Sequence, residues 1–215
     1  MNESTVWYEY VLDIAKLAKK EGLTNIMLTN GYINKEPLEE LLPYIDGISV
    51  GLKGFTEEFY RKYSSAELKP VLETLKLLKA KGASFEITYP LITTLNDSTD
   101  EIRNMCIWVK ENLGTDVPLH FYRYYPSYRL ANLPPTPVSE LEGAKKIAQE
   151  AGIRYVYIYY SLGQSFAYGV DEKIYCSDCG KLILHRDKAG NLLTNNTKNG
   201  RCKFCGKQVS FIIVK

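Results

Sequence analysis

Two patterns of apolar and polar residues alternate along the chain. In one pattern apolar residues recur three and four positions apart, which indicates amphipathic helices, and in the other nearly every residue of a short run is apolar, which indicates buried strands. Residues 5–21 show the helical spacing and are followed by Gly22, a common helix stop. We therefore predict an amphipathic helix whose apolar face consists of Val6, Tyr10, Val11, Ile14, Leu17 and Ala18.

The alternation continues to about residue 159. It predicts strands at 25–29, 47–52, 84–89, 117–122 and 153–159, and further helices at 36–43, 56–63, 67–81, 98–112 and 139–151. Strands joined through helices run parallel, because each helix returns the chain to the same end of the sheet. Tyrosine-rich and aliphatic strands without a glycine-rich phosphate loop favour a barrel wall over a doubly wound sheet. The predicted fold class is α/β, a partial (β/α) barrel with parallel strands.

Polar residues follow several of these strands. In a parallel β/α layout the functional residues lie where strands end. This rule selects Thr29, Asn30, Lys53, Thr88, His120 and Arg123.

The composition is that of an ordinary globular protein. Hydrophobic residues make up 45% of the chain, charged residues 24%, and the net charge is +2, which favours neither disorder nor a polyelectrolyte surface. No apolar run approaches the roughly 20 residues that a membrane helix needs, and the first helix is not a secretory signal, so we expect a cytoplasmic protein without a membrane partner. We divide the chain into a β/α domain at 1–160, a linker at 161–172 and a cysteine module at 173–215.

Four cysteines of the module form two pairs, Cys176-Ser-Asp-Cys179 and Cys202-Lys-Phe-Cys205, and a glycine follows each pair. This spacing is typical of a four-thiolate zinc site, in which the filled tetrahedral shell leaves no position for substrate. We predict a structural zinc in a ribbon-like β module, with strands at 181–185 and 209–214. A rubredoxin-like iron fits the same spacing, and two reducible disulfides or thiols without a metal are the alternatives to a metal site.

Several short segments of the sequence resemble the radical S-adenosylmethionine (SAM) protein of the AmmeMemoRadiSam system, a relative of the pyruvate formate-lyase activating enzymes. They are Asn2-Glu3-Ser4-Thr5, Leu28-Thr29-Asn30-Gly31, Gly51-Leu52-Lys53, the segment from Leu91 to Asp97, Pro118-Leu-His120-Phe-Tyr-Arg123 and the terminal cysteine knuckles. The resemblance spans nearly the whole chain. Ser4 stands where the family has proline, and Gly51 stands where it has aspartate.

The resemblance implies a barrel enzyme that cleaves SAM reductively to a 5'-deoxyadenosyl radical with a 4Fe-4S cluster. The family's CxxxCxxC cluster loop does not occur here, and Cys106, at helical spacing with Ile102 and Val109, is expected to be a buried core thiol. The sequence therefore looks like the C-terminal part of such an enzyme, and we expect this chain alone to be inactive. A trimmed core, a late start codon and a split gene remain alternative explanations.

The resemblance also implies roles for single residues. Glu3 would hold the methionyl amine of SAM, and Thr29, Asn30 and Lys53 would meet its carboxylate or its ribose hydroxyls. His120 or Arg123 would close over the adenine or carboxylate end. Each residue has a structural alternative, for example a helix N-terminal charge for Glu3 and a turn for Asn30. The implied partners are the Memo-like and AMMECR-like proteins of the system.

A binding module is the rival class. The cysteine segment is locally basic, as nucleic-acid zinc ribbons often are. Its aromatic residues are limited to Phe204 and Phe211, so a solvated basic face is the commoner interpretation and a nucleic-acid partner comes second.

Overall fold

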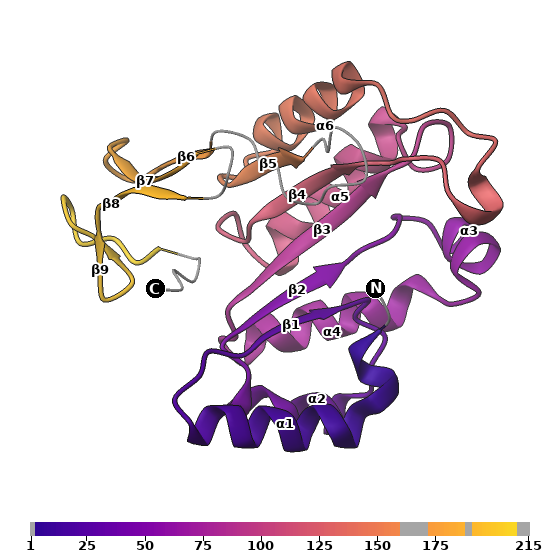
Figure 1. Cartoon of the computed structure of the whole chain (residues 1–215). Coiled ribbons are helices and arrows are strands. Elements are labelled where there is room, and N and C mark those ends of the chain that lie inside the picture. The colour runs from indigo at the N-terminus through magenta and orange to yellow at the C-terminus, as the bar shows by residue number, and fades with distance from the viewer. Residues whose placement is uncertain (1–2, 160–171, 188–190, 210–215) are drawn as a thin grey trace.

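We describe the protein from a computed structural model, in which residues 3–159, 172–187 and 191–209 are described. Five parallel strands form one sheet in chain order (Figure 1). They are β1 (Ile26–Thr29), β2 (Gly47–Gly51), β3 (Phe85–Leu91), β4 (Leu119–Arg123) and β5 (Val156–Tyr159). The α/β fold class and the predicted parallel order are confirmed.

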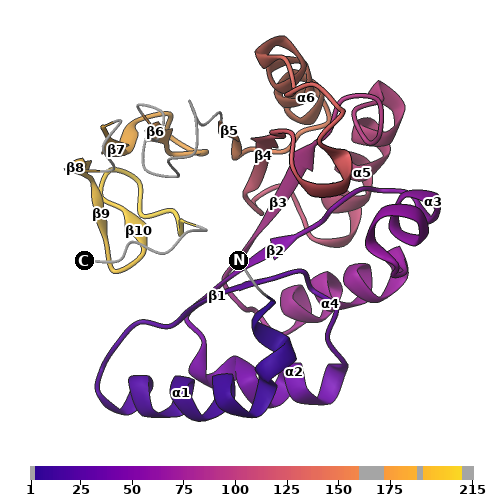
Figure 2. The same ribbon diagram turned by 45° about the vertical axis from the view of Figure 1, so that its right-hand side comes forward.

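Helices connect these strands and lie along one face of the curved sheet (Figure 2). They are α1 (Tyr8–Lys20), α2 (Lys35–Leu41), α3 (Glu57–Phe59), α4 (Leu68–Ala80), α5 (Thr99–Asn112) and α6 (Val138–Glu150). Short 3-10 turns at Ser4–Trp7, Leu42–Tyr44 and Tyr128–Leu130, and a π turn at Tyr60–Ser64, adjoin them. The predicted helix at 5–21 is therefore a 3-10 turn followed by α1.

The core lies between the sheet and its helices. Register places Val50, Ile87, Leu119 and Val156 side by side on neighbouring strands, and all four are buried. β3 alternates strictly between buried and half-buried residues, as expected for a strand with helices on one face only. The other face of the sheet, which we call the concave face, therefore carries the half-buried and polar side chains.

The apolar face predicted for the first helix does not enter this core. α1 buries Leu12 and Ala15, whereas Val6, Tyr10, Ile14 and Leu17 are exposed. The helix is amphipathic as predicted, but most of its apolar face has no cover in the described chain.

The cysteine module contains two small antiparallel sheets. One consists of β6 (Glu172–Tyr175), β7 (Leu182–Arg186) and β8 (Leu192–Asn195), and the other of β9 (Thr197–Lys198) and β10 (Arg201–Cys202). β7 matches the strand predicted at 181–185. The strand predicted at 209–214 and the linker predicted at 161–172 lie outside the described residues, apart from Val209, which is not in a strand, and Glu172, which begins β6.

Tyr155 joins the module to the barrel sheet. Its backbone carbonyl accepts a 2.9 Å hydrogen bond from the N–H of Leu119, the first residue of β4, while its side chain is buried in the module's core with Ile174, Cys176 and Ile183. The module is therefore packed against the β5 edge. Among the residues that the structure describes, none of the helices combines the length and the apolar character that a membrane span requires.

Candidate functional site

The ends of β1 and β2 carry a polar cluster made of Glu3, Thr29, Asn30 and Lys53, which we call the strand-end cluster. The Thr29 hydroxyl donates to Oε1 of Glu3 at 2.7 Å, and the Asn30 backbone N–H donates to Oε2 at 2.6 Å. Glu3 is also the N-cap of the first 3-10 turn, where its Oε1 accepts from the N–H and the hydroxyl of Thr5. The structure therefore brings together four of the six cofactor-binding residues predicted from the sequence.

Both charged members of the strand-end cluster have shifted pKa values. Burial raises the pKa of Glu3, but hydrogen bonds from Asn30, Thr29 and Thr5 outweigh burial and lower it from 4.5. Lys53 is an exposed residue, but its ammonium group is largely removed from water. This burial lowers the pKa of Lys53 from 10.5, while the charge of Glu3 acts in the opposite direction. At neutral pH the cluster thus presents an anionic and a cationic group side by side.

Gly51 has no side chain and so leaves room for the side chain of Lys53. A Cβ atom built on Gly51 would lie 2.7 Å from Nζ of Lys53, so the ammonium group occupies the space over the end of β2. Gly31, at φ +75°, turns the chain directly after β1, and its N–H donates to the Thr29 hydroxyl at 3.1 Å. Asn30 therefore both lies in the predicted turn and belongs to the strand-end cluster.

Asn96 supports this cluster through the backbone of Lys53. The sequence interpretation did not select Asn96 as a site residue. Its side chain is fully buried and accepts from the Ile92 N–H at 2.7 Å, while Nδ2 donates to the carbonyls of Lys53 and Pro90 at 2.8 Å each. The only sequence signal was the Leu91 to Asp97 segment of the family resemblance. Three hydrogen bonds of one buried amide group therefore fix the loop after β3 against the backbone of Lys53.

His120 lies on the concave face in β4, whereas the strand-end cluster lies at the ends of β1 and β2. Its Nε2 is 3.1 Å from Oε2 of Glu86, although neither ring nitrogen meets the geometry of a hydrogen bond and both are buried. The ring stacks on Tyr157 and Tyr159, with centroids 4.8 and 5.5 Å away. Burial raises the pKa of Glu86, but His120 and Ser49 outweigh it and lower the pKa from 4.5. A role of His120 in SAM binding stays a prediction.

The side chain of Arg123 contacts the proline-rich loop. Its Nε donates to the Thr136 carbonyl at 2.6 Å, and its guanidinium group lies 5.1 Å from the centre of the Tyr125 ring. These contacts organise the loop that precedes α6. A contact of Arg123 with SAM also stays a prediction.

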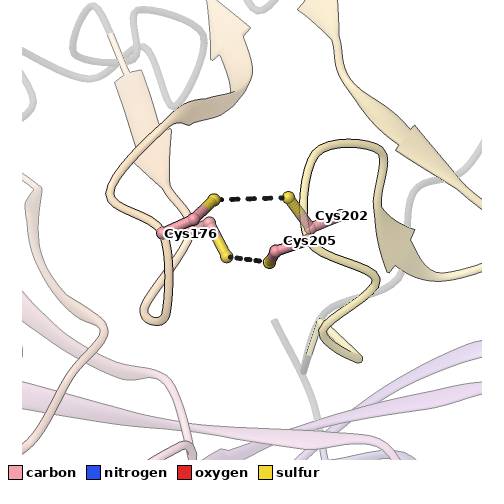
Figure 3. Close-up of side chains that lie close together, drawn as sticks. Cys176, Cys202 and Cys205 are labelled. Carbon is pink, nitrogen blue, oxygen red and sulfur yellow. Dashed lines mark hydrogen bonds between the residues drawn. The ribbon is translucent and has the colours of Figure 1, made fainter.

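The four cysteines of the module converge from two loops of the same construction (Figure 3). In each loop the first cysteine's carbonyl accepts from the glycine that follows the pair, Gly180 and Gly206, and both bonds are 2.9 Å long. Both glycines have positive φ, +67° and +77°, which the turn requires and which other residues rarely adopt. The two cysteine pairs therefore form matching knuckles.

The sulfur geometry suits one tetrahedral metal ion. The ligand atoms of Cys176, Cys179, Cys202 and Cys205 all lie within 4.8 Å of one another. Sγ of Cys176 is 3.5 Å from Sγ of Cys205, and Sγ of Cys179 is 3.8 Å from Sγ of Cys202. Zinc–sulfur bonds of about 2.3 Å at tetrahedral angles require sulfur separations of about 3.8 Å. The donor set and its spacing thus fit a metal site that has no open position.

Amide groups favour the thiolate form of Cys176. Burial raises the pKa of Cys176, but the N–H groups of Cys179 and Asp178 outweigh it and lower the pKa to about 7. The N–H group of Lys207 lowers the pKa of Cys205, but burial and its sulfur contacts with the other three cysteines outweigh that bond and raise the pKa to about 12. Outside the module, Cys106 is buried in α5, and burial raises its pKa to about 12. The prediction of a buried thiol in the core is confirmed for Cys106.

The comparisons with known proteins agree with this fold. Residues 1–106 match the model of the Radical SAM superfamily. The chain is 38% identical over 212 residues to an uncharacterized protein of Methanocaldococcus jannaschii, MJ0808, a match that covers 98% of this chain and 61% of that protein. It is 23% identical over 163 residues to pyruvate formate-lyase 1-activating enzyme of Escherichia coli K12, which covers 70% of this chain and 66% of the enzyme.

A solved structure has the same fold. The crystal structure of a domain of pyruvate-formate lyase-activating enzyme from Bacteroides vulgatus superposes with a TM-score of 0.66 at 15% identity, over 74% of this chain and 96% of that one. The sheet is thus that of a partial radical SAM barrel. Residues 1–106 therefore belong to the radical SAM superfamily, and activating enzymes of pyruvate formate-lyase are among the proteins that the chain is similar to. It spans about 61% of the length of its Methanocaldococcus relative.

Proposed function

We propose that this chain is the SAM-binding part of a radical SAM enzyme of the AmmeMemoRadiSam type and that it is inactive on its own. The observation that supports this most directly is the strand-end cluster, which lies within the superfamily match and sets an anionic group beside a cationic one. The methionyl part of SAM is a zwitterion and needs this pair of charges.

Glu3 has room for one more donor. Its Oε1 accepts from Thr29 and twice from Thr5, but Oε2 accepts only from Asn30 among the described residues. A carboxylate offers about four lone-pair positions, so Oε2 can also take an ammonium group. In this arrangement Lys53 meets the carboxylate of SAM, and Thr29 and Asn30 hold Glu3 at a fixed orientation between them.

The bound cofactor would supply the redox chemistry. A 4Fe-4S cluster would supply the electron for reductive cleavage of a carbon–sulfur bond of SAM, with methionine and a 5'-deoxyadenosyl radical as the products. The residues of this chain bind and orient SAM. Since no CxxxCxxC triplet occurs in the sequence, the cluster ligands have to come from elsewhere. Memo-like and AMMECR-like proteins are the partners we propose, and the cytoplasm is the compartment.

SAM affinity tests the binding role. Calorimetric titration of the 215-residue chain with SAM should give measurable binding that Lys53→Met or Glu3→Gln weakens at least tenfold. Lys62→Met removes an exposed lysine outside the cluster and serves as the control. Equal affinity for SAM in all four proteins would refute the assignment of the strand-end cluster as the SAM site.

Product analysis tests the inactivity. The chain is treated anaerobically with iron, sulfide and a strong reductant, and the mixture is then assayed for 5'-deoxyadenosine. We expect none above the protein-free background. Formation of 5'-deoxyadenosine at more than one turnover per chain would show that the chain is a complete enzyme.

For the cysteine module we propose a structural zinc. The four thiolates would hold the ion between the two knuckles, and their closed shell would stabilise the module without chemistry at the metal. Rubredoxin-like iron has the same ligands, so metal analysis of the purified protein decides between the two ions.

A further inference from the structure

Glu86 presents a carboxylate on the concave face of the sheet, in the central strand β3 (Figure 1). Its side chain is 39% exposed, whereas Phe85 and Ile87 on either side of it are buried in the core. Burial raises the pKa of Glu86, but contacts with His120 of β4 and Ser49 of β2 outweigh burial and lower it from 4.5. The concave face therefore carries a negative charge at neutral pH that the strand-end cluster does not use.

His120, on the strand beside Glu86, is a buried residue without a hydrogen-bond partner among the described residues. Only 6% of it is exposed, and both ring nitrogens are buried. Its Nε2 lies 3.1 Å from Oε2 of Glu86 without the geometry of a hydrogen bond. A buried polar group that makes no hydrogen bond costs free energy, so each one in a protein calls for a reason. The pair is therefore a candidate binding site more than a device that stabilises the fold.

Three tyrosine rings extend from His120 along the same face. Tyr157 and Tyr159 stack on the imidazole at interplanar angles of 25 and 26°, and Tyr122 stacks on Tyr159 with ring centres 5.0 Å apart. Alternate residues of a strand share a face, so these side chains of β4 and β5 lie on the concave face with Glu86. Tyr122 is 38% exposed, so this row of rings reaches the surface.

A carboxylate beside aromatic rings suits an organic cation. Aromatic faces attract ammonium groups, and the attraction grows where water is excluded. A carboxylate adds a hydrogen bond between opposite charges. An anionic ligand would be repelled by Glu86, and Ca²⁺ or Mg²⁺ takes about six or more oxygen ligands, whereas this site offers one carboxylate and the hydroxyl of Ser49. The chemistry of the site therefore favours a protonated amine.

The position of Glu86 relates this site to the strand-end cluster. In the strand register Gly51 is opposite Thr88, and Thr88 is opposite His120. Neighbouring strands are about 4.8 Å apart, so the Lys53 ammonium group over Gly51 and the His120 position lie about 10 Å apart in one row. Glu86 lies two residues, or about 7 Å, before Thr88 along β3. A small molecule of the size of an amino acid spans such distances.

We propose that Glu86 binds the ammonium group of a small amine substrate beside the row of tyrosine rings, and that Ser49 and His120 hold the carboxylate in place. The substrate class is an organic amine that is protonated at neutral pH, with its reacting end directed toward the strand-end cluster. The direction of the reacting end rests on the proposed function, because the strand-end cluster then has to hold SAM. The amine site itself rests on the concave face alone.

Three probes of similar shape test the site on the 215-residue chain. Phenethylammonium, 2-phenylethanol and phenylacetate carry a positive charge, no charge and a negative charge at pH 7. Each is titrated into the protein and followed through the NMR signals of the tyrosine rings. We expect phenethylammonium to bind at least tenfold more tightly than the other two and to shift the signals of Tyr122 and Tyr159. Equal binding of the amine and the alcohol would overturn the proposal.

A charge-removing substitution locates the bound amine. Glu86→Gln keeps the shape of the side chain and should weaken phenethylammonium binding at least tenfold, while binding of 2-phenylethanol stays the same. Glu111→Gln removes a negative charge at an exposed position of α5 and should change neither. Thermal melting shows whether each variant is folded. Undiminished amine binding by folded Glu86→Gln protein would contradict the assignment.

A second substitution tests the positioning role of the imidazole. His120→Phe keeps an aromatic ring against Tyr157 and Tyr159 but removes both nitrogens. Because His120 helps to lower the pKa of Glu86, that pKa should rise in the variant. Loss of phenethylammonium binding on acidification should then occur at a higher pH than in the wild type. An unchanged pH dependence would mean that His120 acts through ring packing only.

SAM binding by the same proteins separates this inference from the proposed function. A chain that binds phenethylammonium through Glu86 but does not bind SAM would leave the amine site standing and refute the proposed function. A chain that binds SAM but not phenethylammonium would refute the amine site alone. SAM also carries an ammonium group, so displacement of phenethylammonium by saturating SAM would show that Glu86 belongs to the SAM site and would overturn the inference.

Discussion

The side-chain amide of Asn96 donates a 2.8 Å hydrogen bond to the backbone carbonyl of Lys53 and so joins the loop after β3 to the loop after β2. A second bond from the same amide group reaches Pro90, and its oxygen accepts from Ile92. A fully buried amide with three partners is a rigid support. The position of the Lys53 ammonium in the strand-end cluster therefore depends on a residue that does not itself belong to the cluster.

Replacing Asn96 should affect both stability and SAM binding. Asn96→Ala removes three buried hydrogen bonds, and we expect a loss of about 3 kcal/mol in the free energy of unfolding, because the groups left behind are unpaired. SAM affinity should fall as well, since the Lys53 loop loses its anchor. Urea denaturation and calorimetry measure the two effects. Asn112→Ala, at an exposed asparagine whose side chain donates to the Trp108 carbonyl, should change neither.

The sequence predicts the fold better than it predicts the site. Periodicity places all five strands, since buried parallel strands and amphipathic helices leave strong signals. It cannot say whether an apolar helix face is covered, which is why the exposure of Ile14 and Leu17 emerges only in three dimensions. Asn96 and Glu86 carry no pattern of their own, because their roles come from contacts between segments far apart in the chain.

Lowering the pH should remove the stabilising effect of Glu3. Its pKa is lower in the folded protein than the ordinary value of 4.5, so its contribution is fully present above pH 4.5 and is lost as the pH falls through the folded value. Glu3→Gln should lower the free energy of unfolding by about 1 to 2 kcal/mol at pH 7, since the carboxylate is only partly buried. Denaturant titrations at pH 7 and pH 3 should show this difference shrinking. Glu111→Gln, at an exposed position, should show no difference at either pH.

A carboxylate at position 51 should change the titration of Lys53. In Gly51→Asp the flexible end of Lys53 has to move, since a Cβ there would lie 2.7 Å from Nζ, and the new carboxylate then pairs with the ammonium group. An opposite charge at this distance favours the charged lysine, so the pKa of Lys53 should rise from its lowered value. NMR titration of the lysine side chain measures it. Gly51→Asn has nearly the same shape, and an equal rise in that variant would contradict the electrostatic explanation.

Metal content should follow the cysteine knuckles. We expect about one zinc and no stable iron per chain, and loss of the zinc in Cys176→Ser and Cys202→Ser, because each substitution opens the four-thiolate shell. Elemental analysis after attempted iron–sulfur reconstitution checks the stoichiometry. Cys106→Ala removes a cysteine outside the module and should keep the zinc. About four irons per chain would instead show that the knuckles hold a cluster.

Tyr155 should transmit the effect of the metal to the barrel sheet. Its backbone carbonyl is bonded to Leu119 of β4, and its side chain lies in the module's core with Cys176, so metal binding stabilises a residue that belongs to both parts. Removal of the metal by a chelator should lower the melting temperature of the barrel in the wild-type protein by several degrees, since about 1 kcal/mol corresponds to 2–4 °C in a domain of this size.

Tyr155→Ala should abolish that coupling without removing the metal, because no thiolate is changed. The variant should melt at a lower temperature than the wild type, and a chelator should then leave the barrel transition where it is. Tyr10→Ala, at an exposed tyrosine on α1, should behave like the wild type in both conditions. A chelator effect of the same size in Tyr155→Ala would mean that the module acts on the barrel through other contacts.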